Sequence, residues 1–242
     1  MNPIVVIPAR LASTRLPGKP LADIGGRPMI VHVLLRAQEA GIGPVAVACA
    51  DPEIADAVTA AGGVAVMTDP ALPSGSDRVH AALAALDPHG AHDIVVNLQG
   101  DVPTVAPALL LAVIGPLSDP AVDIGTLVTP IESPEEAALR SVVKAACAFD
   151  GDGCISPALY FSRAVIPAGD GPLWHHIGIY AFRRAALARF VALPESPLER
   201  REKLEQLRAL EAGMRIGCAR VDAGPFGVDT PADLDRARQV LA

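Results

Sequence analysis

A cluster of basic side chains follows the first apolar run of the chain. Residues 8–20 contain three cations, Arg10, Arg15 and Lys19, together with two hydroxyl side chains and Gly18. Arginine and lysine neutralise and hydrogen-bond phosphate oxygens, and a glycine lets the backbone approach a ligand closely. Ligands bind beyond the carboxyl ends of the strands in open α/β sheets. We therefore predict that this loop binds the phosphates of a nucleotide.

The spacing within this loop excludes two common kinds of phosphate site. It matches neither the P-loop pattern nor the GxGxxG pattern, which argues against an ATPase and against a nicotinamide-dependent enzyme. A basic loop with prolines is often only a solvated connection between elements. The density of cations and their place directly after an apolar run favour phosphate binding.

Two aspartates are suited to hold a divalent cation. Asp101 follows the apolar run 94–98 after a glycine, and Asp229 stands in a loop just before Thr230. Magnesium takes oxygen ligands, commonly one or two protein carboxylates completed by phosphates and water. Taken singly, Asp101 could form a turn, and Asp229 could help to cap the last helix. Their occurrence together with the basic loop favours a magnesium site made by both.

A third polar segment, residues 74–79, precedes a run rich in alanine and leucine. Gly75 permits an irregular turn, and the Ser76 hydroxyl can cap the helix that follows. Arg78 is either a solvated side chain of this helix or a cation that binds a ligand. The residues alone favour neither interpretation over the other.

Buried strands alternate with helical stretches in the first part of the chain. Runs that are apolar on both faces are typical of parallel strands covered by helices on each side. Such runs occur at residues 4–7, 45–49, 64–68 and 94–98. They predict an α/β fold with a mostly parallel sheet and helices on both faces.

Capping signals mark several helix starts. Asp51 and Thr230 each precede a proline, a residue favoured at the first helical position. Ser196 and Glu199 have the spacing of a capping box, and the leucines that follow share one face as far as Gly213. We therefore predict one helix that begins at Ser196 and is stopped by Gly213.

The pattern changes between about residues 123 and 183. Strand-like runs separated by turns, among them Asp150–Gly153, predict a smaller, mostly antiparallel extension. Such an extension is a common place for acceptor binding and subunit contact. Neither an internal repeat nor a low-complexity linker divides the sequence, so we predict a single domain over residues 1–242 that carries this extension.

Composition and charge exclude several classes of protein. The chain is 51% hydrophobic with a formal net charge of -7, so we expect a packed core and no nucleic-acid partner. No apolar run approaches the roughly 20 residues that span a bilayer. No signal-peptide pattern follows Met1, and we expect a cytoplasmic protein without membrane insertion. The four cysteines form no CxxC pair and indicate neither a zinc site nor disulfides.

These motifs resemble those of the CMP-sugar synthetases. The resemblance rests on Ile7–Leu21, Ser74–Val79, Val95–Asp101 and Gly227–Pro231. It implies a Rossmann-like, glycosyltransferase-A-like nucleotidyltransferase fold, CTP as co-substrate, Mg²⁺, and a homodimer that forms through the antiparallel extension. It also implies metal ligation by Asp101 and Asp229 and catalytic roles for Arg10, Arg15, Lys19 and Asp101. Nucleotide binding is implied for Ala9, Arg10, Ser13, Lys19, Ser74, Arg78 and Gln99.

Three later segments resemble the octulosonate cytidylyltransferase branch of this family, namely Tyr160–Pro167, His175–Tyr180 and Leu204–Arg208. The resemblance implies transfer of CMP from CTP to 3-deoxy-D-manno-octulosonate (Kdo), an acidic eight-carbon sugar, in lipopolysaccharide biosynthesis. Arg163 would then pair with the sugar carboxylate, because arginine binds carboxylates in a bidentate manner. Substrate binding is implied for Gln99, Arg163, His176, Tyr180, Glu205 and Gln206.

Plainer roles are open for the same side chains. Arg163 could form a structural ion pair, His176 could be a hydrogen-bonded core residue, and residues 205–206 could lie on a solvated helix face. The chain also departs from the family pattern at Val102, where an acidic residue is common, and at His175, where a basic residue is common. The connection between residues 167 and 174 is short for the family.

Three other functions fit parts of the same pattern. The same chemistry could activate sialic acid or 8-amino-Kdo in place of Kdo. A non-catalytic nucleotide sensor would keep the nucleotide pocket without releasing pyrophosphate. A glycosyltransferase would also bind nucleotide and metal near a strand-end aspartate, but it would consume a nucleotide-sugar.

Overall fold

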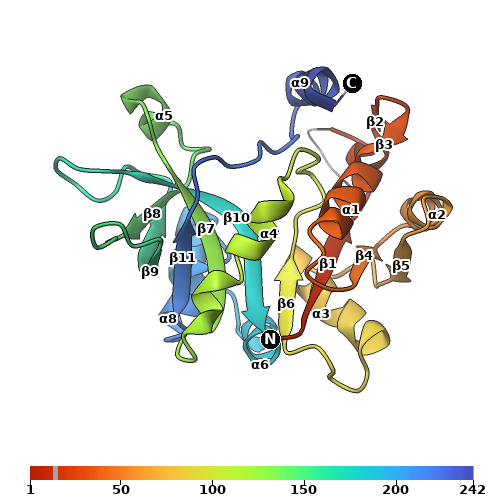
Figure 1. Cartoon of the computed structure of the whole chain (residues 1–242), viewed down its shortest axis with the longest axis horizontal. Coiled ribbons are helices and arrows are strands. Elements are labelled where there is room, and N and C mark those ends of the chain that lie inside the picture. The colour runs from red at the N-terminus through yellow and green to blue at the C-terminus, as the bar shows by residue number, and fades with distance from the viewer. Residues whose placement is uncertain (13–15, 242) are drawn as a thin grey trace. The chain divides into compact units, whose positions relative to one another are not determined.

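The computed structural model describes residues 1–12 and 16–241. The chain forms two compact units (Figure 1). The first comprises Met1–Leu111 and Pro225–Ala242, and the second comprises Ala112–Gly224. The first unit therefore contains both ends of the chain, and the second is a continuous insertion.

The first unit is built on a parallel sheet with the strand order β5-β4-β1-β6. All four of its strands were predicted from apolar runs, and β4 and β6 are buried along their whole length. The edge strand β5 differs, because Val64 and Met67 are each 52% exposed. The predicted sheet with helices on both faces is confirmed, and the exposure of these two side chains reflects the position of β5 at the edge of the sheet. The strands are β1 (Pro3–Ala9), β4 (Val45–Cys49), β5 (Val64–Met67) and β6 (Ile94–Asn97).

Three helices connect these strands. The helix α1 (Met29–Glu39) packs on β1 and β4, α2 (Pro52–Ala60) packs on β4 and β5, and α3 (Gly75–Leu86) contacts all four strands. Since crossovers between parallel strands are right-handed, α1 and α2 lie on one face of the sheet. The connection through α3 runs back across the sheet in the opposite direction and places that helix on the other face.

The predicted starts of α2 and of the last helix, α9 (Pro231–Leu241), are confirmed, but two of the predicted caps are wrong. The hydroxyl of Ser74, rather than that of Ser76, accepts a hydrogen bond from the backbone N–H of Asp77 and caps α3. Ser76 is the second residue of the helix and is buried. The Asp51 carboxylate makes no capping bond to α2 and instead accepts the backbone N–H of Leu11 at 2.7 Å. Loop contacts therefore replace the local cap at Asp51.

The C-terminal segment returns to the first unit. Its helix α9 (Pro231–Leu241) packs through Leu234 and Ala237 on Ile24 and Met29. These partners belong to the short hairpin β2–β3 and the start of α1. The same core includes Val228, which fixes the loop immediately before α9. The remaining short elements are the 3-10 helix η1 (Lys19–Leu21), β2 (Asp23–Ile24), β3 (Arg27–Pro28) and α4 (Pro107–Ala112), where the first unit gives way to the second.

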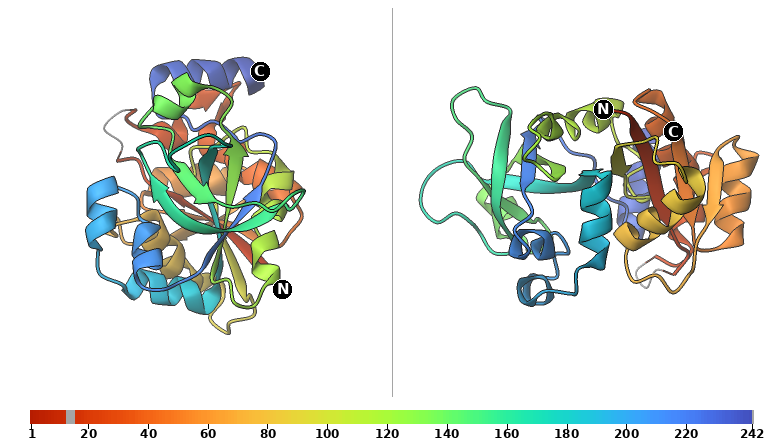
Figure 2. Two further views of the ribbon diagram at one scale, coloured as in Figure 1. Left: turned by 90° about the vertical axis from the view of Figure 1, so that its left-hand side faces the viewer. Right: turned by 90° about the horizontal axis from the view of Figure 1, so that it is seen from below.

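The second unit contains five strands in the order β10-β7-β11-β9-β8, and β8 also pairs with β10. The strand order therefore closes on itself, and Figure 2 shows how strongly the strands curve and cross. The β7–β11 pair is parallel, whereas the other pairings within this unit are antiparallel. The strands are β7 (Ile124–Pro130), β8 (Lys144–Cys147), β9 (Ile155–Ser162), β10 (Trp174–Arg183) and β11 (Ile216–Arg220).

The predicted extension over about residues 123–183 lies wholly inside this unit, which also includes the chain up to Gly224. That the 242 residues behave as a single domain stays a prediction. The short elements of the unit are η2 (Gly115–Ser118), α5 (Pro134–Ala138), α6 (Arg184–Ala192), α7 (Pro197–Glu202) and α8 (Leu207–Glu211).

The single helix predicted from Ser196 to Gly213 is wrong. The capping box of Ser196 and Glu199 is confirmed, but α7 ends at Lys203, which adopts a left-handed conformation with φ 58. The Glu199 carboxylate receives two N–H groups of Arg208, at 2.5 and 2.9 Å. This contact between the two short helices stabilises the turn that interrupts the predicted leucine face.

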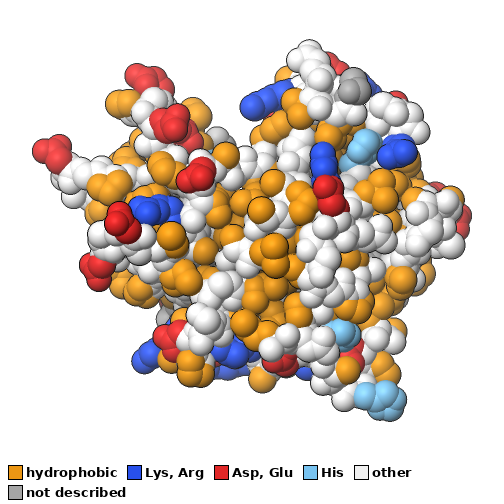
Figure 3. Space-filling model, in the orientation of Figure 1, with side chains coloured by type: hydrophobic (Ala, Val, Ile, Leu, Met, Phe, Trp, Pro, Cys, Tyr) orange, Lys and Arg blue, Asp and Glu red, His pale blue; other side chains and the backbone are white. Residues whose placement is uncertain are grey.

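The surface mixes charge and apolar side chains. On the face drawn in Figure 3, acidic and basic side chains are interspersed among hydrophobic ones. Among the described residues, no helix is long and apolar enough to cross a membrane. All four cysteines are free thiols.

Candidate active site

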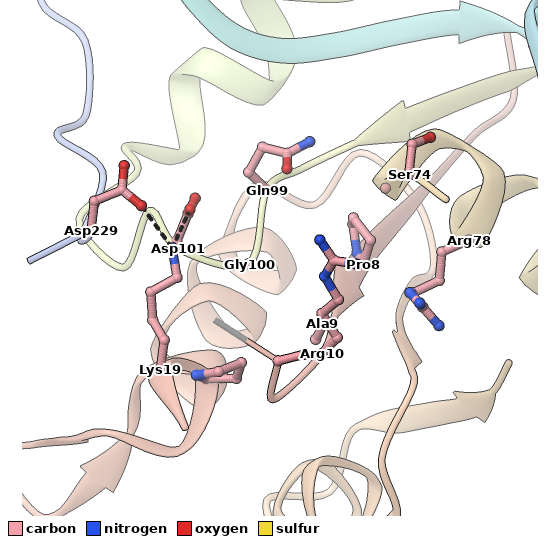
Figure 4. A pocket seen from close by; sticks show the side chains of 13 residues that line it. Pro8, Ala9, Arg10, Lys19, Ser74, Arg78, Gln99, Gly100, Asp101 and Asp229 are labelled. Atoms are coloured by element: carbon pink, nitrogen blue, oxygen red, sulfur yellow. Dashed lines mark hydrogen bonds and ion pairs between the residues drawn. The ribbon is translucent and has the colours of Figure 1, made fainter. Parts of the chain in front are cut away.

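A cavity of about 400 Å³ lies at the carboxyl ends of β1 and β6 in the first unit. Three of the segments singled out in the sequence meet there: the basic loop, the start of α3 and the strand end at Asp101 (Figure 4). The segment before α9 adds the fourth wall. The lining residues are Pro8, Ala9, Arg10, Ala12, Lys19, Pro20, Ser74, Gly75, Arg78, Gln99, Gly100, Asp101 and Asp229.

The ammonium of Lys19 joins the two predicted metal ligands. Its Nζ lies 2.7 Å from Oδ2 of Asp101 and 3.0 Å from Oδ1 of Asp229. The two carboxylates come from positions 128 residues apart in sequence (229 − 101), yet they converge on one cation (Figure 4). The structure therefore brings Lys19, Asp101 and Asp229 together, as the sequence pattern predicted.

Backbone features fix this arrangement. Gly18 begins η1 with φ 67, a left-handed conformation that glycine adopts without strain, and so turns the chain into Lys19. A Cβ at Gly100 would lie 3.0 Å from the carbonyl oxygen of Pro8, so a larger residue would press the strand-end loop away from β1. The backbone N–H of Val228 donates to the carbonyl of Asp101 at 2.8 Å and holds Asp229 beside it.

The two carboxylates also set the charge state of Lys19. Partial burial by itself lowers the pKa of this amine. The charges and hydrogen bonds of Asp101 and Asp229 outweigh that effect and raise the pKa of Lys19 above its ordinary value. The side chain is therefore a cation at neutral pH.

Other predicted nucleotide-binding residues line the same cavity. Arg78 is 2% exposed, and its Nη1 donates to Oγ1 of Thr68 at 2.6 Å and to the carbonyl of Asp69 at 3.1 Å. Burial, followed by the nearby charge of Arg10, lowers the pKa of Arg78. The solvated interpretation of Arg78 is therefore wrong: it is a buried cation whose side chain reaches the cavity wall.

The side chains that line the cavity suit a ligand with several negatively charged groups and a polar heterocyclic ring. Arg10 is exposed and faces the cavity together with Ala9, Ser74 and Gln99 (Figure 4). The amide nitrogen of Gln99 donates to Oδ1 of Asn97 at 3.2 Å, which orients the side chain at the strand end. Cations, backbone groups and an amide are the groups that bind phosphates and a nucleobase edge.

Two of the predicted site residues, Ser13 and Arg15, lie outside the described residues. Several residues of the predicted segments also line the cavity although no individual binding role was predicted for them, namely Pro8, Ala12, Pro20, Gly75 and Gly100. Sequence reasoning missed the supporting contacts of Asp51 and Thr68. Their signal was weak, because a strand-end threonine and an aspartate before a proline have common local roles.

Comparison with known proteins identifies the family. The model of a family described as cytidylyltransferase matches residues 4–216. The chain belongs to this cytidylyltransferase family. It is 64% identical over 240 residues to a 3-deoxy-manno-octulosonate cytidylyltransferase of Rhodospirillum centenum, covering 99% of this chain and 93% of the relative. It is 60% identical over 241 residues to one of Paramagnetospirillum magneticum, covering 100% and 98%.

Solved structures confirm the predicted nucleotidyltransferase fold of this cytidylyltransferase-family chain. A CMP:2-keto-3-deoxy-manno-octonic acid synthetase complexed with CTP matches with a TM-score of 0.90 and 43% identity, covering 99% of this chain and 98% of that chain. A nucleotidyl transferase of Methanothermobacter thermautotroptrophicus matches with a TM-score of 0.63 and 16% identity, covering 99% and 97%. The second likeness shows the shared fold alone.

The predicted acceptor-binding residues of this cytidylyltransferase-family chain lie in the second unit, apart from Gln99. Arg163 follows β9, and its guanidinium donates to the carbonyls of Glu202 at 2.8 Å, Arg140 at 3.0 Å and Lys203 at 3.3 Å. A guanidinium has five N–H groups, and these three bonds leave two for a ligand. The side chain is thus held in place while two of its N–H groups stay available to a ligand.

His176 and Tyr180 belong to one aromatic group on β10. The His176 ring is 7% exposed, lies 3.0 Å from Oγ1 of Thr126, and packs edge-on against Phe161 with ring centroids 4.7 Å apart. Burial, then the charge of His175, lowers the pKa of His176 from 6.5 to about 3. His176 is therefore neutral at neutral pH, and its hydrogen-bonded, buried position fits the plainer core role as well as a ligand-binding one.

Glu205 and Gln206 follow the turn after α7. Burial, then the charge of Glu205, raises the pKa of Tyr180, so these two side chains are neighbours. Gln206 is 5% exposed, and its Nε2 has no hydrogen-bond partner among the described residues. The expectation that residues 205–206 lie on a solvated helix face is wrong for Gln206, which is buried.

Proposed function

We propose that this protein transfers CMP from CTP to Kdo, giving CMP-Kdo and pyrophosphate. The observation that carries the proposal is the convergence of Asp101, Asp229 and Lys19 in a cavity whose other walls are the basic loop and the capped start of α3. High identity to octulosonate cytidylyltransferases over the whole chain supports the same reaction. The likeness to a synthetase structure complexed with CTP supports the nucleotide.

Mg²⁺ fits the donor set of this cavity. Two hard carboxylate oxygens already converge on one cation, the ammonium of Lys19. Magnesium commonly takes one or two protein carboxylates and completes its shell with phosphates and water. Asp101 and Asp229 would hold the ion, which when bound would polarise the α-phosphate and lower the pKa of the attacking hydroxyl.

The protein's own contribution is positioning and charge neutralisation. The anomeric C2 hydroxyl of the sugar loses its proton to solvent and its oxygen attacks the α-phosphorus in line, so that the new P–O bond forms and the bond to the bridging oxygen of pyrophosphate breaks. Lys19 and Arg10 neutralise charge on the departing pyrophosphate, a role also predicted for Arg15. Ser74, Arg78 and Gln99 hold the nucleotide.

Two observations support an acidic, hydroxyl-rich acceptor. Arg163 keeps two N–H groups that suit a carboxylate, and the buried amide of Gln206 offers a donor that suits a hydroxyl. We assign His176, Tyr180 and Glu205 to the same acceptor site. A sugar acid such as Kdo carries both kinds of group.

We also propose a homodimer, a cytoplasmic location and a role in lipopolysaccharide biosynthesis, as the family resemblance implies. A surface suited to subunit contact lies on β9, where alternate side chains point outward. Ile155 is 48% exposed and Leu159 is 67% exposed, with Pro157 exposed between them. Aligned apolar side chains on a strand are a common feature of subunit contacts.

The reaction is tested by measuring pyrophosphate release from CTP and Mg²⁺ with Kdo, 8-amino-Kdo, sialic acid or no acceptor, and by identifying the product by mass. Release with Kdo and formation of CMP-Kdo is the expected result. Release only with another acid would keep the chemistry and overturn the acceptor. Nucleotide binding without release for any acceptor would overturn the proposed reaction in favour of a nucleotide sensor.

A further inference from the structure

Lys144, on β8, has an unusual environment for a charged side chain. It is fully buried, and its ammonium donates to three backbone carbonyls, those of Leu139 at 3.0 Å, Val142 at 2.6 Å and Arg163 at 2.9 Å. Burying an ammonium costs free energy unless it is well hydrogen-bonded. Burial, followed by the charges of Arg140 and Arg163, lowers the pKa of this amine. Lys144 ties the loop 139–142 to the end of β9.

Glu202, at the end of α7, binds the same strand end from the other side. Its carboxylate accepts hydrogen bonds from Oγ of Ser162 at 2.7 Å and from the backbone N–H of Arg163 at 2.9 Å. Its own carbonyl accepts Nε of Arg163 at 2.8 Å. Glu202 therefore holds both the main chain and the side chain of Arg163.

The same strand end is bonded to the turn that precedes Gln206. Arg163 donates to the carbonyl of Lys203, the left-handed residue at which the chain turns from α7 towards α8. Gln206 lies three positions beyond this turn and carries the buried Nε2 without a partner among the described residues. Unpaired buried amides are rare and costly, so this donor indicates a ligand that bonds to it.

The charge around Arg163 suits an anion. Lys144, Arg140 and Arg163 bring positive charge to this strand end, and Glu202 brings one negative charge. A local excess of cations in a chain of net charge -7 favours a negatively charged group there.

We propose that Lys144 and Glu202 are positioning residues that hold Arg163 and the turn carrying Gln206 in the geometry that binds the acceptor sugar. This inference rests on the proposed function, because it assigns a role in acceptor binding. Lys144 holds Arg163 by a hydrogen bond to the backbone carbonyl of Arg163. Glu202 holds it by hydrogen bonds from the backbone N–H and the Nε of Arg163. Neither residue touches the reacting atoms.

The test separates acceptor binding from nucleotide binding. Lys144→Met keeps the length of the side chain but removes the charge and three hydrogen bonds. Glu202→Gln keeps the shape and removes the charge of the carboxylate that holds Arg163. For each variant we expect the KM for Kdo to rise about tenfold or more, because a hydrogen bond to a charged group is lost. The KM and Kd for CTP should stay unchanged.

A second acceptor probe isolates the carboxylate. The C1 amide of Kdo offers Arg163 no charge, so the wild-type protein should prefer Kdo over this amide. The preference should shrink in both variants, since Arg163 is no longer held in place. Loss of stability alone would not change a ratio between two acceptors measured on the same protein.

Arg183 offers a matched control within the same unit. Its guanidinium also donates to three backbone carbonyls, those of Val122, Leu117 and Asp119, at 2.8, 2.8 and 3.0 Å. None of these partners is a predicted acceptor residue. Arg183→Met should lower the urea midpoint without changing the KM for Kdo or the preference for Kdo over its amide.

The outcomes are distinguishable. If Lys144→Met does not fold, by near-ultraviolet circular dichroism, Glu202→Gln carries the test. Equal changes in the KM values for Kdo and CTP, or an effect of Arg183→Met equal to that of Glu202→Gln on Kdo, would overturn this inference alone. Absence of CMP-Kdo with the wild-type protein would overturn the proposed function and this inference with it.

Discussion

The two units of the molecule hold a lysine in opposite ways. In the first unit, Lys19 is bound by the carboxylates of Asp101 and Asp229, both of which are partly exposed. In the second unit, Lys144 is fully buried and bound by three backbone carbonyls. Carboxylates are also ligands for metal ions, whereas the main-chain carbonyls around Lys144 are held in place by the loop 139–142 and the end of β9.

The difference teaches what each lysine can do. The ammonium of Lys19 neutralises two carboxylates that a metal cation can also neutralise, so a metal ion can replace it between them. The ammonium of Lys144 is buried and fixed by three backbone carbonyls, so its role is structural. The proposed magnesium and phosphate chemistry belongs to the first arrangement, and the positioning of Arg163 belongs to the second.

The largest expected effect comes from removing one of the two acids. Asp101→Asn should lower kcat on the order of 10²–10³-fold, because the charge stabilisation supplied through a bound metal is worth several kcal/mol. The measurement is pyrophosphate release at saturating CTP and Mg²⁺. Asp56→Asn, an exposed aspartate on α2 outside the cavity, is the control for loss of one negative charge. If a folded Asp101→Asn variant kept the wild-type turnover, the assignment of Asp101 as a metal ligand would be wrong.

A smaller effect is expected for Lys19→Met. This variant distinguishes a lysine that a metal ion can replace from one that stabilises the fold. Turnover should fall about 10²-fold through loss of a cation from the phosphate site. Binding of Mn²⁺ without nucleotide, followed by electron paramagnetic resonance, should tighten about tenfold, because the two acids lose their competing cation. Unchanged or weaker Mn²⁺ binding would contradict the idea that a metal ion replaces the Lys19 ammonium. A large fall in the urea midpoint would mean that Lys19, like Lys144, mainly stabilises the fold.

The smallest effect concerns the fixed interior of the second unit. His176 has an ordinary pKa of 6.5 when unfolded and about 3 when folded, mainly through burial. Between these values the unfolded chain binds a proton that the folded chain does not, so stability is complete above about pH 6.5 and falls as the pH drops towards 3. The expected contribution is about 1.4 kcal/mol per pH unit.

Urea unfolding at about pH 6 and pH 5 measures this slope. His176→Gln should unfold with a shallower pH dependence than the wild-type protein, whatever its absolute stability. Burial also lowers the pKa of His175, which remains in both proteins and cancels in the comparison. Identical slopes would mean that His176 is accessible to protons in the folded state.

The sequence was most informative where function depends on residue type and position after a strand. The loop around Lys19, the strand-end Asp101 and the loop with Asp229 were all predicted, because strand ends of a parallel sheet meet at one edge. The interruption at Lys203 was not predictable from the leucine pattern, since the turn is stabilised by the side-chain contact between Glu199 and Arg208 across it. The network around Lys144 was missed because an isolated lysine in an apolar strand gives no sign of three carbonyl partners.

The closure of the strand order in the second unit also bears on self-association. Each of its five strands has a partner on both sides in the described part of the chain, since β8 pairs with both β9 and β10. Open strand edges are the usual templates on which chains add to one another and grow into fibrils. Because each strand already has two partners, contact between copies through side chains such as those on β9 favours a finite, dissociable assembly over one that grows by adding strands.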